Sequence, residues 1–186
     1  ADVTVKAMYN GKELHSYTTP LEKGIEATIN APSVPGYTAD PQNQKVTPGD
    51  DPAANTVIFN YTKNVGNITV IVTEGGVELY RQDGGTVTKG DKIELTGKVA
   101  APNIEYYTIP TAPKSVMVGS TDVKDKLATY QYDGNGDIVV TYEYTRKKQN
   151  VTIIKKDVDT GAEIERQTLP NLEVGKSYAF NAGTVS

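Results

Sequence analysis

The feature that most constrains this chain is internal repetition. A triplet of β-branched residues occurs three times, and each copy is followed by a glycine turn and then by a second glycine. The triplets are Val3-Thr4-Val5, Ile68-Thr69-Val70 and Val151-Thr152-Ile153. These landmarks are displaced by 65 to 66 residues from the first copy to the second, and by 83 to 85 residues from the second to the third. Landmarks that keep their order and spacing indicate one structural unit written out repeatedly.

The later parts of the first two copies also correspond. Ala31-Pro32-Ser33-Val34 matches Ala101-Pro102-Asn103-Ile104, and the closing run at 57–63 matches 140–146. We therefore predict two modules and the opening half of a third, at residues 1–64, 65–148 and 149–186. Half a module cannot close its own core. We expect that last segment to be marginally packed, and to pair with the second module or with another molecule through an exposed edge.

Apolar and polar residues alternate with a period of two, which is typical of β-strands. Val57, Phe59 and Tyr61 alternate with Ile58 and Asn60, and Asn10-Gly11 supplies the positive φ angles of a tight hairpin. The fold class we predict is mainly β, as tandem small modules arranged end to end in an elongated rod. Each module is either a β-sandwich or a β-grasp-like sheet covered by a short helix. Residues 25–29 favour a strand, whereas 121–130 fit a short helix capped by Thr121 or a strand equally well.

Composition excludes several classes of function. The 186 residues carry a formal net charge of −4, which argues against a nucleic-acid-binding protein. Mean hydropathy is −0.44, so we expect no membrane-spanning helix and no direct membrane insertion. There is no cysteine and only one histidine, His15, and no acid–base constellation stands out. These observations predict a protein that is not an enzyme.

The order of landmarks in the first module resembles a known family. A V-x-V strand and a glycine hairpin precede Ala31-Pro32-Ser33-Val34-Pro35-Gly36-Tyr37, and a V-x-F-x-Y strand closes the module. This order is similar to the mucin-binding (MucBP-type) repeats of Gram-positive surface adhesins, including the mucus-binding proteins of lactic-acid bacteria. The second module departs from the pattern because it has Glu105-Tyr106 in place of the Pro-Gly pair and carries extra residues after Tyr107.

The resemblance implies a secreted, wall-anchored bacterial protein that takes part in cell adhesion and host interaction. Its partners would be mucin or other host glycoproteins, together with neighbouring repeats of the same chain. We interpret the sequence as a piece excised from such a longer protein, located at the extracellular cell surface. The alternative is a spacer module that binds nothing itself and extends a distal adhesive tip.

Sugar binding needs flat aromatic faces and nearby amides. The candidate ligand-binding residues are Tyr37, Tyr106, Tyr107, Tyr130, Tyr132 and Asn103. A binding protein should gather the last four tyrosines of this set on one surface, whereas a spacer should scatter them. The alternative interpretation of each tyrosine is packing across strands with its hydroxyl at the surface.

One acidic segment has spacing that suggests calcium. Asp133, Asn135 and Asp137 place oxygen ligands at alternate positions, but the residues that an EF-hand requires further on are absent. A hairpin turn explains the segment better. We therefore predict no cofactor, with these three residues retained as a calcium candidate.

Overall fold

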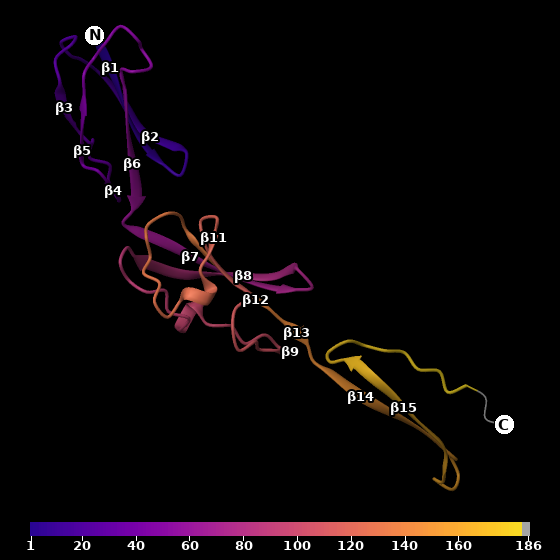
Figure 1. Cartoon of the computed structure of the whole chain (residues 1–186). Helices are drawn as coiled ribbons and strands as arrows, with labels where there is room; N and C mark the ends of the chain where they lie inside the picture. Colours follow the sequence, from indigo (N-terminus) through magenta and orange to yellow (C-terminus); the bar gives the residue numbers. More distant parts are fainter. Residues whose placement is uncertain (184–186) are drawn as a thin grey trace.

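The computed structural model describes residues 1–183 and is mainly β (Figure 1). Within this range the only helical elements are two single 3-10 turns, η1 (Gly97–Val99) and η2 (Lys124–Lys126). The strands form several small sheets in place of one large sheet. The predicted β class is therefore confirmed, as expected from side chains that alternate between two faces.

The first sheet has the strand order β2-β1-β6-β4. Its strands are β1 (Asp2–Tyr9), β2 (Lys12–Pro20), β4 (Tyr37–Ala39) and β6 (Thr56–Lys63). The β1–β2 hairpin turns at Asn10 and Gly11, which both have positive φ. On its other side β1 pairs in parallel with β6, with Val5 opposite Val57. Because β2 and β6 lie on opposite sides of β1, residues 21–55 cross over from the end of β2 to the start of β6.

That crossover forms a second layer over the first sheet. It contains the antiparallel pair β3 (Ala27–Asn30) and β5 (Asn43–Val46). Ile29 and Val46 are buried in one cluster with Val3, Val5 and Phe59. The predicted strand near residues 25–29 is confirmed over the bounds of β3. The helix of the β-grasp alternative is not found in residues 1–64, where a strand pair covers the sheet.

The second sheet has the order β11-β10-β12-β7-β8. Its strands are β7 (Val65–Glu74), β8 (Val77–Thr88), β10 (Ser115–Val118), β11 (Thr121–Asp122) and β12 (Ile138–Glu143). Here too an antiparallel hairpin, β7–β8, is joined in parallel by the last long strand, with Val70 opposite Val140. Val70 holds the place of Val5 in the repeat, and Val140 that of Val57. Both sheets therefore pair their first and last strands in the same register.

A register irregularity recurs at one place in all three hairpins. The pairing shifts after Ala7 in β1, after Val72 in β7 and after Lys155 in β14 (Lys148–Lys156), which pairs with β15 (Glu163–Glu173). These positions are equivalent in the repeat. A bulge adds an extra residue to one strand and increases its twist, so the three hairpins share a local distortion as well as a sequence pattern.

We call each larger sheet, together with the segments that pack on it, a sheet system. The second sheet system differs from the first mainly between residues 109 and 136. The short pair β9 (Tyr107–Thr108) and β13 (Thr145–Arg146) corresponds to the contact of β4 with the end of β6. Strands β10 and β11 and the turn η2 are additions. The segment 121–130 contains both a short strand, β11, and a helical turn, η2. Thr121 lies in β11 and does not cap the turn, so the predicted cap at Thr121 is wrong.

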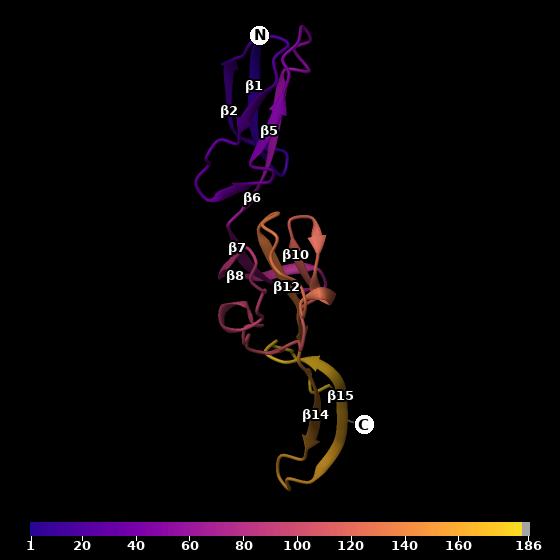
Figure 2. The same ribbon diagram turned by 60° about the vertical axis from the view of Figure 1, so that its left-hand side comes forward.

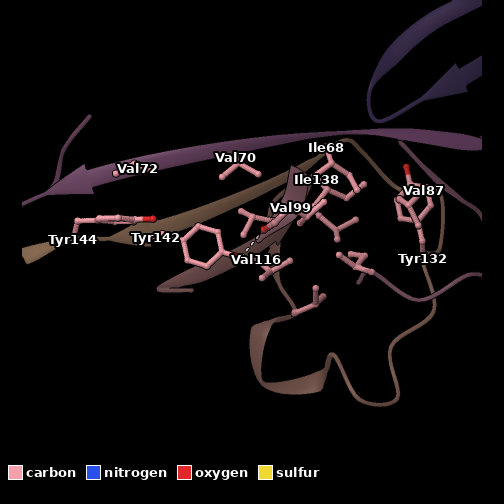
Figure 3. Packing of buried hydrophobic residues seen from close by; sticks show 14 residues of the cluster. Ile68, Val70, Val72, Val87, Val99, Val116, Tyr132, Ile138, Tyr142 and Tyr144 are labelled. Carbon is pink, nitrogen blue, oxygen red and sulfur yellow. Dashed lines mark hydrogen bonds between the residues drawn. The ribbon is translucent and has the colours of Figure 1, made fainter. Parts of the chain in front are cut away.

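Each of the two larger sheets has its own hydrophobic cluster. In the second, Val70, Val116 and Val140 are fully buried, with Tyr144 toward one end and Tyr132 toward the other (Figure 3). Among the described residues, none beyond Tyr144 belongs to either cluster. The β14–β15 hairpin, which Figure 2 shows clear of the two larger sheets, leaves most of its side chains at least partly exposed.

Candidate functional site: hollows beside the Ala-Pro turn

The four predicted tyrosines of the second module separate into two pairs at opposite ends of β7, Tyr130 with Tyr132 and Tyr106 with Tyr107. Tyr132 packs against Gly66 near the start of that strand, where a Cβ on the glycine would lie 2.5 Å from the tyrosine hydroxyl oxygen. Tyr107 donates a hydrogen bond of 2.9 Å to Glu74 at the strand's far end. Eight residues of strand span roughly 26 Å. The expectation that a binding protein gathers these tyrosines on one surface is therefore not met.

The prediction that Tyr132 binds a ligand is wrong. Its side chain is only 1% exposed and its hydroxyl donates to the backbone carbonyl of Gly136. Burial raises the pKa of this hydroxyl well above the usual value. The aromatic-plus-polar spacing of Tyr130-Gln131-Tyr132 could not reveal this, because alternation fixes which residues share a face and not which face is covered. Tyr130 is partly buried beside the same cluster.

Tyr106 and Tyr107 contact one cation, which the sequence did not reveal. The Arg146 guanidinium lies 5.7 Å from the ring centre of Tyr106 and 5.4 Å from that of Tyr107. Such distances are within the range of cation–π attraction. Tyr106 has a φ of +72°, and it holds the place of Gly36, whose φ is +83°. A tyrosine has thus replaced a glycine in a left-handed turn, and its ring contacts the next segment at Gly175.

The Ala-Pro segment is held by the same hydrogen bond in both sheet systems. Tyr61 donates to the carbonyl of Pro32, and Tyr144, its equivalent, donates to the carbonyl of Pro102. The backbone N–H of Tyr37 donates a hydrogen bond of 3.1 Å to the carbonyl of Val34. The N–H of its equivalent, Tyr107, donates one of 3.2 Å to the carbonyl of Ile104. These contacts fix a turn on the surface of each unit.

In the first sheet system this turn forms one wall of an open hollow of about 400 Å³. The opposite wall is the end of the β3–β5 pair, where Asn30 faces Asn43 across the strands. These two residues and Gln42 are exposed and line the hollow together with the partly exposed Tyr37, whose ring packs edge-on against Tyr9 at 5.1 Å. A hollow lined by an aromatic residue and by amides suits a hydroxyl-rich ligand.

In the second sheet system the equivalent turn borders a hollow of about 530 Å³. Its wall contains Asn103 and Tyr107 from the turn, and Leu79 and Tyr80 from β8. Tyr80 is 45% exposed. Sequence reasoning missed Tyr80, as well as the three amides of the first hollow. Asn30 could have been found because it directly precedes the Ala-Pro segment in the sequence. Tyr80 lies near that segment only in the folded chain.

The proposed calcium segment instead contacts the first sheet. Asp137 accepts hydrogen bonds of 3.0 Å from the Lys63 ammonium and from the Asn67 backbone N–H. Lys63 N–H also donates to the carbonyl of Gly134 at 2.8 Å. Burial works to raise the pKa of the Asp137 carboxyl, but the hydrogen bonds from Asn67 and Lys63 outweigh it and hold that pKa below its usual value.

Asp137 is therefore already paired with a cation of the protein. The Asp133 carboxylate accepts the Asn135 N–H at 2.9 Å, as in an ordinary Asx turn. In residues 1–183 no three His, Asp or Glu side chains gather as a metal site requires. The arrangement does not support the calcium candidate.

The junction between units has a repeated hydrogen-bond pattern. Asn64 N–H donates to Gly36 and Asn64 carbonyl accepts from Lys89, at 2.9 and 2.8 Å. The equivalent Lys147 N–H donates to Tyr106 and its carbonyl accepts from Val174, at 2.8 and 2.9 Å. The segment after the second sheet thus joins it through the same backbone contacts as those that join the first two sheets.

No family model and no curated protein matches this chain. Over the described range, no helix is long and apolar enough to cross a membrane.

Proposed function

We propose that this chain is a non-catalytic repeat fragment of a Gram-positive cell-surface adhesin, which binds mucus glycoproteins or other host surface molecules. The observation that carries the proposal is the hollow beside Tyr37. The Ala31–Tyr37 segment, on which the resemblance to MucBP-type repeats rests, forms one wall, and the amide residues Asn30, Gln42 and Asn43 line the same hollow. In this account the protein is extracellular and wall-anchored in its full-length form.

The modules at 1–64, 65–148 and 149–186 would follow one another as an elongated rod. Two observations support this arrangement. Each of the first two ranges has its own hydrophobic cluster, and the same backbone contacts recur at both junctions. Lys63 adds a side-chain contact to Asp137 across the first junction. Repeated short junctions of this kind would restrict the angle between neighbours and carry a binding surface away from the cell wall.

Binding through such hollows is expected to be weak and multivalent. Both hollows are open to solvent, and neither encloses a ligand on most sides. An isolated saccharide would then bind with a dissociation constant of about 1 mM or weaker. Many repeats acting together raise the overall avidity without any new contact.

The test is binding of the full 186-residue chain to immobilised mucin, before and after glycosidase treatment. We expect the treatment to reduce binding, and we expect the double variant Gln42→Ala/Asn43→Ala to bind less than the wild type. Gln167→Ala is the matched control, because Gln167 is an exposed amide on β15, outside both hollows. Equal binding to treated and untreated mucin would contradict a saccharide ligand, and an unaffected double variant would contradict this site.

A spacer role is the second candidate, and one observation favours it. The tyrosines near Gly66 and those near Glu74 do not form one surface, as expected if the tyrosines serve packing. A spacer would show no binding to mucin in the same assay, although its junction contacts would remain.

A further inference from the structure

The β14 strand has an unpaired edge. Strand β15 pairs with one side of it, and within the described part of the chain no strand pairs with the other. Its equivalents are different, since β1 has β6 on that side and β7 has β12, both in parallel. An unpaired edge offers a row of free backbone N–H and C=O groups to an incoming strand.

The apolar side chains of this hairpin and of the segment that follows it are those of an uncovered core. Val151 and Tyr178 are 37% and 42% exposed. Their equivalents in the second unit, Ile68 and Ile93, are each 4% exposed because they belong to the buried cluster to which β10 and β12 contribute. Phe180, a further member of this set, is 46% exposed. An apolar face beside an open edge is the arrangement that a further strand would complete.

We propose that β14 is an acceptor for one parallel β-strand with the pattern Val-x-(Phe/Tyr)-x-Tyr. The chain itself fills this position twice, with Val57-x-Phe59-x-Tyr61 beside β1 and Val140-x-Tyr142-x-Tyr144 beside β7. Ile153 holds the place of Val70, so the register places Ile153 opposite the valine of the incoming strand. The proposal concerns a protein–protein contact and does not depend on saccharide binding.

One charge at this edge disfavours indiscriminate pairing. Lys155 holds the place of Val72, and its ammonium lies 2.7 Å from the Glu165 carboxylate. Inward-pointing charged residues are a common protection of edge strands against aggregation. Lys155 therefore limits the apolar part of the acceptor to Val151 and Ile153, which restricts the strands that fit.

The absence of cysteine from the chain makes the register directly testable. The full chain carrying Ile153→Cys is oxidised with a peptide that copies residues 137–147 and carries Val140→Cys. The control peptide carries Val139→Cys, whose side chain points to the opposite face. We expect at least about tenfold more disulfide-linked product from the first peptide, since disulfides tolerate only short Cβ separations.

Equal yields from the two peptides would overturn the proposal, as would a chain that links to its own copies in preference to the peptide. A second measurement uses the unmodified chain and the unmodified peptide. We expect amide hydrogen exchange at residues 151–156 to slow by about tenfold when the peptide is added, because the free backbone groups become paired. Unchanged exchange in β14 would also overturn it.

Discussion

Removing one buried hydroxyl should destabilise one unit and leave the other unchanged. Tyr144 is 1% exposed and donates its hydroxyl to the Pro102 carbonyl. In Tyr144→Phe the ring still fills its space, but the carbonyl loses its partner. A lost hydrogen bond of this kind costs about 1–2 kcal/mol. We expect the free energy of unfolding of the second core to fall by that amount.

The matched substitution is Tyr61→Phe, which removes the equivalent bond to Pro32 in the first core. Residue-resolved native-state hydrogen exchange measures the two cores separately. We expect each substitution to lower protection in its own cluster, and the double variant to show the sum of the two effects, since distant sites are additive. If Tyr144→Phe weakened both cores equally, or neither, the account of two independent repeated units would be refuted.

The buried Tyr144 hydroxyl also predicts that the stability of the second core falls at alkaline pH. Burial raises the pKa of Tyr144 from 10.0 to about 12. Above pH 10 the unfolded chain releases the proton more readily than the folded chain, so the folded state is progressively disfavoured as the pH rises toward 12. Tyr144→Phe should make the second core less sensitive to pH in this window. Denaturation at pH 9 and pH 11 would measure the difference, and an unchanged sensitivity would contradict burial of the hydroxyl.

Two further changes test one contact inside the second unit and one contact between the two units. Gly66→Ala should lower the free energy of unfolding of the second core by about 1–3 kcal/mol, because the new methyl group would overlap the Tyr132 hydroxyl. Urea unfolding measures this loss. Gly49→Ala is the control, because a methyl group there would meet no neighbouring atom. The Asp137 carboxyl has a lowered pKa, so its pairing with Lys63 stabilises the fold above the unfolded carboxyl's pKa and is lost as the pH falls through the folded value. Asp137→Asn should therefore be less stable than the wild type at pH 7 but lose less stability on acidification to pH 3; equal losses would contradict the pairing.

The repeat carried most of the fold information in the sequence. Displacements of 65 and 83 residues, read from the triplets and the closing runs, match the parallel registers Val5 with Val57 and Val70 with Val140. The reason is physical, since alternating strands buried on one face have their register fixed by which residues must be covered. The Ala-Pro turn was also recognisable, because its residues recur.

The candidate site was less predictable because it depends on contacts between segments far apart in the sequence. Tyr132 resembled an exposed aromatic residue, yet it fills the space above a glycine 66 positions earlier in the chain. Asp137 resembled a calcium ligand, yet Lys63 of the preceding unit neutralises it. Neither partner is marked by spacing. The fold of the second unit brings Tyr132 to Gly66, and the relative position of the two sheets brings Asp137 to Lys63.

The most direct test of the account is an NMR titration of the isotopically labelled full chain with saccharides released from mucin. The account predicts chemical-shift changes at residues 30–43 in the first hollow and 102–107 in the second, with weak, fast-exchange binding at both. It would be contradicted by an absence of shifts at saturating saccharide, or by shifts confined to residues outside both hollows.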